Sequence, residues 1–580
     1  MELIPWRTKR RQEPKVEDDR KPRIWASQIT FSDGSTLEID KDDVCVIVGP
    51  NNSGKSATLR AISSKLGEHR ATSPVVREIT FKRHGSAEDV EMWLESSTKI
   101  VPGYYSDKFE MFGNSVPRAS VGYRWGRDDG IEDLAGFFCT FLNAEGRLQA
   151  ANPPDSIALT KEGPRHPIHI LQWNDSIEKR ISGYFEKAFG TGIVVHRNAG
   201  GKVPVMVGAV PAPKPGTDRH SIDYVVNLEK LPAIHTQGDG MRSFLGVLLY
   251  SAVGSSSILL IDEPEAFLHP PQAKHLGNFL VSETGSRQLF IATHSGDVLR
   301  GVLDSESGRV RVLRICREGD SNRVCLLENS DIKSIWGDPL LRYSNILDGL
   351  FHERVIVCES DSDCRFYSAI ADAIYESAPE GERKPDVMFT HCGGKDRVAL
   401  ITRSLRALDV PVSAVLDFDV LNAEKPLSDI VEASAGSWSE LRKDWLTVNK
   451  AIGNMRPQLG VAEVRRDIDA ALSQEKGHIL TETARKTIQD ALKASSPWAT
   501  AKSVGTRFIP SGDESQALVR LIEGLERLSI FVVPVGELEQ FVKSVGGHGP
   551  AWVANALRKD LEKDPELSEA KFFVRRVAQI

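Results

Sequence analysis

Residues 49–56 read GPNNSGKS, which fits the pattern G-x-x-x-x-G-K-[ST] of a loop that binds nucleotide phosphates. In such a loop, backbone N–H groups surround the phosphate oxygens, and the N-terminus of the following helix adds its dipole. Lys55 is placed to reach the β- and γ-phosphates of ATP, and Ser56 to hold Mg²⁺. The residues expected to contact the nucleotide are Gly49, Asn51, Asn52, Ser53, Gly54, Lys55, Ser56 and Ala57.

A second polar group follows two apolar runs further along the chain. Asp262 and Glu263 come directly after one run, and Thr293-His294-Ser295 comes after the next. Asp262 is placed to bind the Mg²⁺ shell, directly or through water, and Glu263 to act as the general base for the attacking water. His294 is placed to sense the γ-phosphate, although a lone histidine is more often structural.

A third group, in the second half of the chain, consists of four carboxylates that follow predicted strands. These are Glu359, Asp363, Asp417 and Asp419, with a Gly-Gly-Lys turn ending at Lys395 between them. Such turns lie on one edge of a parallel sheet, so the carboxylates could converge and hold Mg²⁺ or Mn²⁺. Two ions about 3.5–4 Å apart would activate water and stabilise the leaving oxygen of a phosphodiester. The alternative is that these acids only cap helices.

Apolar runs predict the strands that position these groups. Residues 44–48 precede the phosphate loop, and a helix is expected over 57–62. This strand–loop–helix context argues against the alternative of a chance glycine turn. Strands are also expected at 257–261 and 288–292, where the carboxyl ends of open α/β sheets bind ligands.

The second half repeats a strand–helix rhythm that predicts a smaller parallel sheet of its own. The expected strands are 354–358, 387–390, 412–416 and 530–533, and the expected helices between them are 366–378 and 398–408. Residues 425–525 are charged and helix-rich, which predicts an inserted bundle. Two more helices are expected near the C-terminus.

Other segments carry weaker patterns. A hairpin is expected over 24–39, with its turn at Asp33-Gly34, and a closing hairpin over 310–327. Between the phosphate loop and the next motif, strands are expected at 76–83, 90–93, 194–207 and 221–228, and helices at 130–148, 176–189 and 244–253.

Composition limits the class of protein. The chain has 580 residues, 41% of them hydrophobic and 26% charged, with a net charge of −7, so two to four soluble domains are expected. No apolar run approaches the roughly 18 residues of a membrane span, and no signal peptide is evident. The seven cysteines form no C-x-x-C pair, which argues against a zinc ribbon and fits a reducing cytoplasm. The mild acidity does not favour a globally basic nucleic-acid binder, but local patches decide such contacts.

The first two groups together resemble the ABC-type ATPase heads of the SMC, RecF and OLD proteins. In those heads, a signature segment before the Asp-Glu strand caps ATP bound to the opposite subunit, and its matching positions are Gly238, Asp239 and Gly240. Gln237 stands where the family signature opens with serine. The resemblance implies a homodimer, or a higher homo-oligomer, formed through the ATPase heads with ATP between them.

The third group resembles a Toprim domain, which topoisomerases, DnaG-type primases and OLD nucleases share. Ser360 replaces the family glycine after Glu359, while Asp363 keeps the expected spacing. In OLD nucleases a later acid completes a second metal site, matched here by Glu539, with Glu537 as the alternative. The family lysine that stabilises the phosphate is matched either by Lys543 or by His548 at the corresponding turn.

The whole chain is therefore expected to be α/β, with an ABC-type P-loop ATPase domain followed by a Toprim domain. We expect a flexible arm at 1–23, the ATPase domain at 24–345 and the Toprim domain at 350–580. The ATPase domain is expected to contain an inserted, candidate dimerisation region at about 100–230. The Toprim domain is expected to contain a helical insertion at about 425–525. This order resembles the OLD family.

The resemblance implies an ATP-hydrolysing, Mg²⁺- or Mn²⁺-dependent DNA endonuclease that takes part in bacterial defence against phage. It also implies a cytoplasmic location, with an accessory defence protein as a candidate partner. Two alternatives remain. One is a RecF- or SMC-like ATPase switch whose Toprim half binds DNA or a partner without cleaving. The other is a Toprim nuclease acting on RNA. The lack of zinc-binding cysteines argues against a primase, and the lack of a recognisable strand-passage domain with its tyrosine argues against a topoisomerase.

Overall fold

The computed structural model describes residues 21–68, 70–103, 105–159, 162–305, 307–319, 321–327, 337, 345–379, 384–455, 461–473, 479–492 and 496–579. The chain divides into two compact units, Met1–Trp336 and Gly337–Ile580. Most of the predicted N-terminal arm, residues 1–20, lies outside the described residues.

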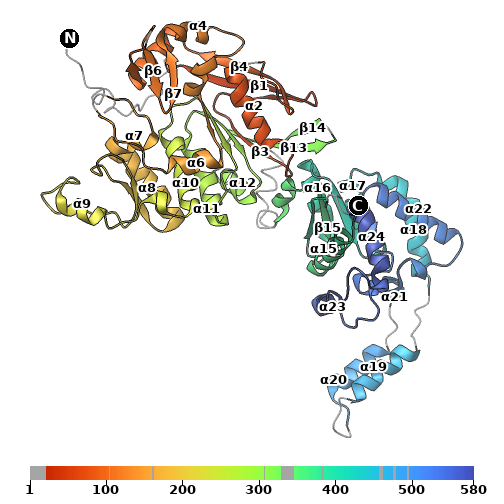
Figure 1. Ribbon diagram of the computed structural model, residues 1–580. Coiled ribbons are helices and arrows are strands. Elements are labelled where there is room, and N and C mark those ends of the chain that lie inside the picture. Colours follow the sequence, from red (N-terminus) through yellow and green to blue (C-terminus); the bar gives the residue numbers. More distant parts are fainter. Residues whose placement is uncertain are drawn as a thin grey trace. The chain divides into compact units, whose positions relative to one another are not determined.

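The main sheet of the first unit has six strands in the order β14-β13-β3-β12-β11-β8 (Figure 1). Neighbours pair in parallel, except that β14 runs antiparallel to β13. The central strands are continuous apolar runs because both faces of the sheet are covered. The strands are β3 Val44–Val48, β8 Cys139–Leu142, β11 Ile258–Asp262, β12 Gln288–Ala292, β13 Val310–Glu318 and β14 Ser321–Leu327.

Helices cover both faces of this sheet. Helix α2, Lys55–Gly67, lies on one face, under a three-stranded antiparallel sheet of β1 Arg23–Phe31, β2 Thr36–Glu38 and β4 Val76–His84. The other face carries α10 Asp239–Val253, α11 Pro270–Glu283 and α12 Gly296–Leu303 (Figure 1). The hairpins predicted over 24–39 and 310–327 are confirmed.

Smaller elements complete the first unit. A three-stranded sheet contains β5 Lys99–Val101, β6 Lys108–Met111 and β7 Asn114–Pro117, and a hairpin contains β9 Gly192–Val195 and β10 Val205–Gly208. The helices include α4 Val121–Trp125, α5 Ala135–Phe138, α6 Ala144–Ala150, α7 Pro167–Trp173 and α8 Asp175–Phe189. The helix predicted over 176–189 is therefore confirmed.

Three local predictions are wrong, and a fourth, the single strand over 194–207, is replaced by the antiparallel hairpin of β9 and β10. Residues 90–93 belong to α3, Ala87–Ser97, because a capping box at Ser86 starts a helix that buries Val90 and Leu94 on one face. Residues 221–228 form α9, Ile222–Leu228, which buries residues four positions apart.

The third wrong prediction is the single helix over 130–148. Strand β8 interrupts this segment and pairs in parallel with β11 at the edge of the main sheet. Long-range pairing overrides the local helical pattern here. The region expected to be inserted at about 100–230 therefore returns to the main sheet at β8.

The second unit is built on a four-stranded parallel sheet in the order β16-β15-β17-β18. Its strands are β15 Arg354–Cys358, β16 Val387–His391, β17 Val412–Leu416 and β18 Ile530–Val532. The flanking helices are α15 Asp361–Glu376, α16 Val398–Ala407, α23 Gly549–Ala556 and α24 Ser568–Ala578. Buried Phe366, Tyr367, Trp552 and Phe573 share one core.

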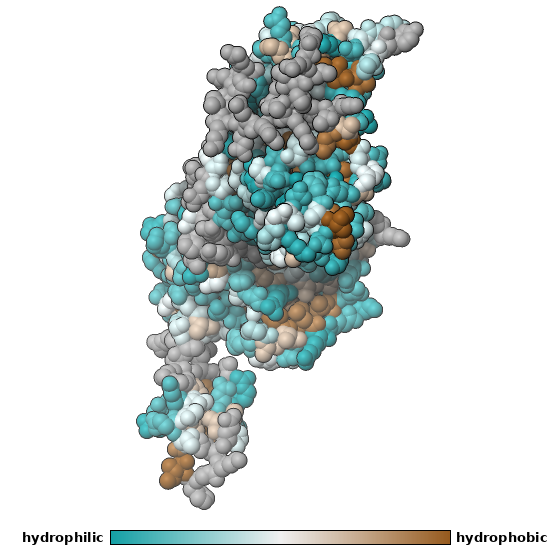
Figure 2. All heavy atoms as spheres, turned by 90° about the vertical axis from the view of Figure 1, so that its left-hand side faces the viewer, coloured by the Kyte–Doolittle hydropathy of each residue, from teal (hydrophilic) through white to brown (hydrophobic). Residues whose placement is uncertain are grey.

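Six helices between β17 and β18 form the helical insertion expected from the sequence. They are α17 Glu424–Ala433, α18 Trp438–Gly453, α19 Val461–Ser473, α20 Glu482–Ala491, α21 Pro497–Val504 and α22 Asp513–Arg527. Among the described residues, no helix combines the length and apolar character needed to cross a membrane. Most of the described face seen in Figure 2 is hydrophilic.

Candidate nucleotide and metal sites

The predicted phosphate loop connects β3 to α2. Gly49 and Gly54 have positive φ angles of 143° and 102°, which favour glycine. A Cβ on Gly49 would lie 2.0 Å from the carbonyl oxygen of Ile315 in β13, so a side chain has no room there. Helix α2 begins at Lys55, directly after the loop, and its N-terminal N–H groups suit an anion. All residues predicted to contact the nucleotide, from Gly49 to Ala57, lie in this loop or in the first turn of α2.

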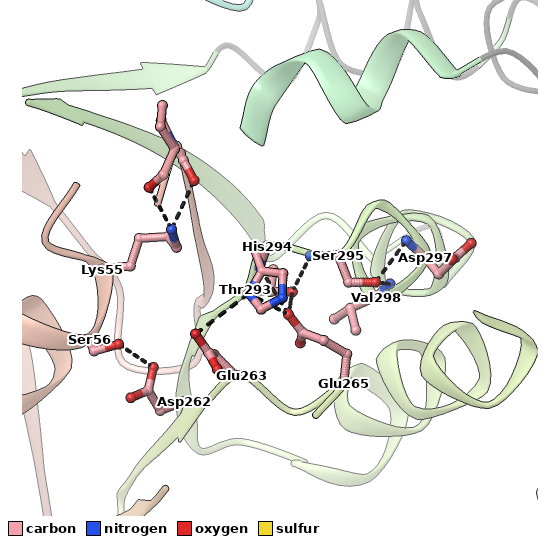
Figure 3. A network of polar contacts seen from close by, with 12 residues as sticks. Lys55, Ser56, Asp262, Glu263, Glu265, Thr293, His294, Ser295, Asp297 and Val298 are labelled. Carbon is pink, nitrogen blue, oxygen red and sulfur yellow. Dashed lines mark hydrogen bonds and ion pairs between the residues drawn. The ribbon is translucent and has the colours of Figure 1, made fainter. Parts of the chain in front are cut away.

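The first two side chains of α2 make polar contacts that link the phosphate loop to the end of β11 (Figure 3). The Lys55 ammonium is buried and donates 2.8 Å hydrogen bonds to the carbonyl oxygens of Gly49 and Pro50. The Ser56 hydroxyl donates a 2.8 Å hydrogen bond to Asp262 Oδ1. The structure thus brings together the serine and the carboxylate predicted to share Mg²⁺.

Asp262 and Glu263 stand at the carboxyl end of β11. Burial raises the pKa of Asp262, while the hydrogen bond from Ser56 acts in the opposite direction. Glu263 has a φ of 48°, a left-handed conformation that is strained for a residue with a side chain. Its side chain remains half-exposed, as a base that activates solvent water requires.

His294 follows β12, as expected, and lies beside Glu263. Its Nδ1 is 3.5 Å from Glu263 Oε1 and 3.5 Å from Glu265 Oε1. The Thr293 hydroxyl and the backbone N–H of His294 donate to Glu265 Oε1 at 2.8 and 2.9 Å (Figure 3). Burial raises the pKa of Glu265. Glu265, which the sequence analysis missed, therefore fixes the turn that carries His294.

Arg147 of α6 is a second residue that the sequence analysis missed. Its side chain is 0% exposed, and its guanidinium donates to the carbonyl oxygens of Asp262 and Glu263, the latter at 2.8 Å. Its Nε also donates to Ser243 Oγ at 3.0 Å. A fork of donors suits such paired acceptors. Arg147 therefore holds the backbone that presents both carboxylates.

The signature-like residues lie at the start of α10. Gly238 caps the helix, and Asp239 Oδ1 accepts a 2.8 Å hydrogen bond from Arg242. A Cβ on Gly240 would lie 2.6 Å from the carbonyl oxygen of Phe267, so glycine permits a close approach of the segment that follows β11. Contact of these residues with ATP on another subunit stays a prediction.

The carboxylates of the second unit gather at the carboxyl ends of its parallel strands. Glu359 directly follows β15, and its Oε1 accepts a 3.0 Å hydrogen bond from the backbone N–H of Asp417, which directly follows β17. Asp419 lies two residues further on. Asp363 forms a capping box with Ser360 at the start of α15, so the helix-capping alternative is correct for part of its role.

Two lysines pair with these acids. Lys395 Nζ lies 2.8 Å from Asp419 Oδ2, so this predicted residue joins the cluster. Lys502 Nζ lies 2.9 Å from Asp417 Oδ2 and 3.4 Å from Asp419 Oδ1. The sequence analysis missed Lys502 because it belongs to the helical insertion, where no motif marks it.

The pKa values of the acids show a surplus of negative charge. Burial, followed by the charge of Asp417, raises the pKa of Glu359 to about 8 and that of Asp363 to about 6. Burial also raises the pKa of Asp417, against the opposing effect of Lys502. Burial acts in the same direction on Asp419, but Lys395 and Lys502 outweigh it, so the pKa of Asp419 is lowered.

These four acids supply the type of donor that the predicted divalent metal prefers, although the described group with three ligand atoms within 4.8 Å of one another is Glu537, Glu539 and His548. Carboxylate oxygens are the ligands that Mg²⁺ and Mn²⁺ prefer, and a divalent cation would offset the burial and the charge of Asp417 that raise the pKa values of Glu359 and Asp363. Glu359, Asp363, Asp417 and Asp419 are the residues that would hold it.

A neighbouring cluster contains Glu537, Glu539 and His548. One ligand atom from each lies within 4.8 Å of the others, which could hold a metal ion. His548 Nδ1 is 3.1 Å from Glu539 Oε1. Burial is the main cause of the raised pKa of Asp363, and the charge of Asp417 is the next. The charge of Glu539 raises this pKa further. Lys543 is exposed, and among the described residues no ion pair joins it to a carboxylate.

Comparisons with known proteins match both units. Residues 147–300 match the family described as "AAA domain, putative AbiEii toxin, Type IV TA system". Residues 350–419 match the family "Overcoming lysogenization defect protein-like, TOPRIM domain". These matches confirm the predicted class, an α/β protein in which an ATPase domain is followed by an OLD-like TOPRIM domain.

Individual relatives are distant. Endonuclease GajA of Bacillus cereus (strain VD045) is 25% identical over 146 residues, which are 24% of this chain and 24% of GajA, so the match spans about a quarter of that relative. One similar solved structure is an Smc head bound to the C-winged helix domain of ScpA, which is 13% identical in sequence. The match covers 55% of this chain and 99% of that chain, with a TM-score of 0.33. The SMC head domain from Thermotoga maritima has 12% identity, covers 53% of this chain and 99% of its own, and has a TM-score of 0.27.

Replacing Arg147 tests its support of the nucleotide site. Arg147→Met should lower ATP turnover by about 100-fold while ATP still binds, because a misplacement of about 1 Å of the catalytic carboxylates costs on that order. Turnover and nucleotide binding are measured on the same preparation, with Arg180→Met, a half-exposed arginine of the same unit, as the control. Normal turnover by a folded Arg147→Met protein would show that Arg147 has no positioning role.

The raised pKa values of the acid cluster predict a pH-dependent metal effect. Glu359 binds its proton more tightly in the folded protein, so the metal-free protein loses stability as pH rises from about 4.5 to about 8. Added Mg²⁺ or Mn²⁺ binds the deprotonated acids, and its stabilisation should therefore be larger at pH 8 than at pH 6.

Thermal unfolding with and without metal at the two pH values checks this expectation. Glu359→Gln removes one ligand and should abolish most of the metal-induced shift in Tm. A shift in the wild type that is equal at both pH values, or is unchanged in Glu359→Gln, would contradict the assignment of this cluster as the metal site.

Proposed function

We propose that this protein is an ATP-hydrolysing, metal-dependent DNA endonuclease of the OLD type. The observation that carries the proposal is the cluster of Glu359, Asp417 and Asp419 at the carboxyl edge of the second sheet, with lysines on its acids. The TOPRIM match covers these residues, and the partial similarity to an endonuclease supports the same reaction.

In the first unit, the loop residues bind the triphosphate, and Lys55 moves its ammonium from the loop carbonyls to the phosphate oxygens. Ser56 and Asp262 would hold Mg²⁺, which would offset the charge of the phosphates. Glu263 accepts a proton from the attacking water, and His294 contacts the γ-phosphate from the neighbouring strand end. Arg147 and Glu265 keep these groups in place.

In the second unit, Glu359, Asp363, Asp417 and Asp419 hold Mg²⁺ or Mn²⁺, and Glu537, Glu539 and His548 form the second candidate position. A metal held there would supply Lewis-acid chemistry that activates water and stabilises the leaving oxygen of the phosphodiester. Lys395 keeps Asp419 ionised and oriented toward the cluster. The net reaction is hydrolysis of a phosphodiester bond.

We further propose that ATP is shared between the heads of a homodimer or higher homo-oligomer, with Gly238, Asp239 and Gly240 capping the partner's nucleotide. Binding energy from one nucleotide would then act on two chains, which makes ATP a switch. A role in the bacterial cytoplasm against phage DNA, with an accessory defence protein, is supported by the OLD-like domain order.

Separate substitutions in the two units test the division of labour. Lys55→Ala should abolish ATP hydrolysis because the phosphate clamp is lost. Asp417→Asn should abolish cleavage of plasmid DNA, by at least about 100-fold, and leave ATP hydrolysis largely intact, because removing a group that positions a reacting centre costs on that order. Both activities are measured for both variants with Mg²⁺ and with Mn²⁺.

Two results would contradict the proposal. Absence of cleavage by the wild type under every nucleotide and metal condition would favour a switch that binds DNA without cutting it. Cleavage of RNA but not DNA, by the same preparation and with the same loss in Asp417→Asn, would identify an RNA nuclease instead.

A further inference from the structure

Lys502 reaches the acid cluster from outside the sheet that carries the acids. It belongs to α21 of the helical insertion, yet its ammonium lies 2.9 Å from Asp417 Oδ2 and 3.4 Å from Asp419 Oδ1. One third of its side chain is exposed, which leaves it a path toward solvent and substrate. Neither the domain matches nor the sequence motifs include this residue.

The backbone around Lys502 is fitted closely to the loop that follows β18. Gly505 has a φ of 69°, and a Cβ there would lie 2.1 Å from the carbonyl oxygen of Pro534. A Cβ on Gly536, which has a φ of 108°, would lie 2.0 Å from the carbonyl oxygen of Lys502 itself. Two glycines therefore permit a contact that fixes the end of α21 against this loop.

Hydrogen bonds reinforce the same contact. The backbone N–H of Thr506 donates to Pro534 at 2.9 Å, and the N–H of Phe418 donates to Gly536 at 2.8 Å. The loop after β18 thus touches both the lysine-bearing helix and the residue between Asp417 and Asp419. The position of Lys502 over the acids is built into the backbone and does not depend on a flexible side chain alone.

Lys502 and a metal ion compete for the same oxygen atoms. The lysine occupies Asp417 Oδ2, and Asp419 has a lysine on each oxygen, because Lys395 contacts its Oδ2. A cation that binds these carboxylates must either displace Lys502 or share the oxygens against its positive charge. Of these two acids, Lys395 forms a described ion pair with Asp419 only.

We propose that Lys502 is a movable cation of the nuclease site. Its ammonium pairs with Asp417 and Asp419 until the divalent metal binds. The side chain then moves away from these acids, and the ammonium pairs with a non-bridging oxygen of the scissile phosphate. No bond to Lys502 forms or breaks in either state. The inference rests on the proposed nuclease function and assigns to the helical insertion one of the groups that contact the phosphodiester.

Metal titration tests the first half of the proposal without requiring cleavage. Mn²⁺ is titrated calorimetrically into the full chain without nucleotide or DNA. Lys502→Met keeps most of the aliphatic stem, removes the competing charge and should tighten Mn²⁺ binding by about tenfold, the effect of a modest loss of like-charge repulsion. Lys443→Met, an exposed lysine of the same insertion, should leave the affinity unchanged. Unchanged or weaker binding in folded Lys502→Met and Lys502→Gln would overturn the proposal.

Cleavage at saturating Mn²⁺ tests the second half. Lys502→Met should lower kcat at least tenfold although it binds metal more tightly, and Lys502→Arg should recover part of the loss because guanidinium also binds phosphate. Wild-type kcat in Lys502→Met would overturn the transfer to phosphate. If wild type itself cleaves nothing, the proposed nuclease function and the transfer both fail, while the titration still decides whether Lys502 competes with metal.

Discussion

The gathering of partly buried carboxylates at one edge of a parallel sheet is the constraint on which the candidate site of the second unit depends. Parallel strands β15 and β17 deliver Glu359 and Asp417 to one edge, and Asp417 donates its backbone N–H to Glu359. Burial and mutual charge raise the pKa of Glu359 to about 8, so the cluster is costly without a cation. Lys395 and Lys502 offset part of that cost, and a divalent metal fits the remainder. A local arrangement that is costly by itself is common at functional sites.

The first unit uses the same geometry with a different balance of charge. Asp262 and Glu263 also stand at the carboxyl edge of a parallel sheet, but a buried arginine holds their backbone and a buried glutamate holds the neighbouring histidine turn. Glu263 is kept in a left-handed conformation by these contacts. In both units, residues from elsewhere in the chain support carboxylates at the end of a parallel strand.

The sequence was sufficient where a polar group follows an apolar run. The phosphate loop, Asp262, Glu359 and Asp417 could be placed because a buried parallel strand determines where its last residue lies. The four-stranded sheet followed from the same apolar runs, and the helical insertion from the charged, helix-rich composition of residues 425–525. Local pattern failed at 90–93 and 221–228, where helix caps and a buried helical face outweighed an apparent strand pattern.

Residues whose role comes from distant contacts could not be found in this way. Arg147 forms hydrogen bonds with Asp262 and Glu263, which lie more than a hundred residues further along the chain. Lys502 forms an ion pair with Asp417 from the helical insertion, in which no sequence motif marks it. Strand β8 could not be predicted for the same reason, because its partner strand β11 lies far along the chain. Lys543 had the right type and neighbourhood, but its side chain lies at the surface and makes no ion pair with the acids that the structure describes.

We propose that the acid cluster is a nuclease site and that the nucleotide site controls it. The most direct test measures plasmid cleavage by wild type and Lys55→Ala over a range of ATP concentrations at fixed Mg²⁺ or Mn²⁺. The account predicts that the wild-type cleavage rate changes with ATP, in either direction, and that the Lys55→Ala rate does not. Cleavage that follows ATP identically in both proteins, or ignores ATP in both, would contradict it.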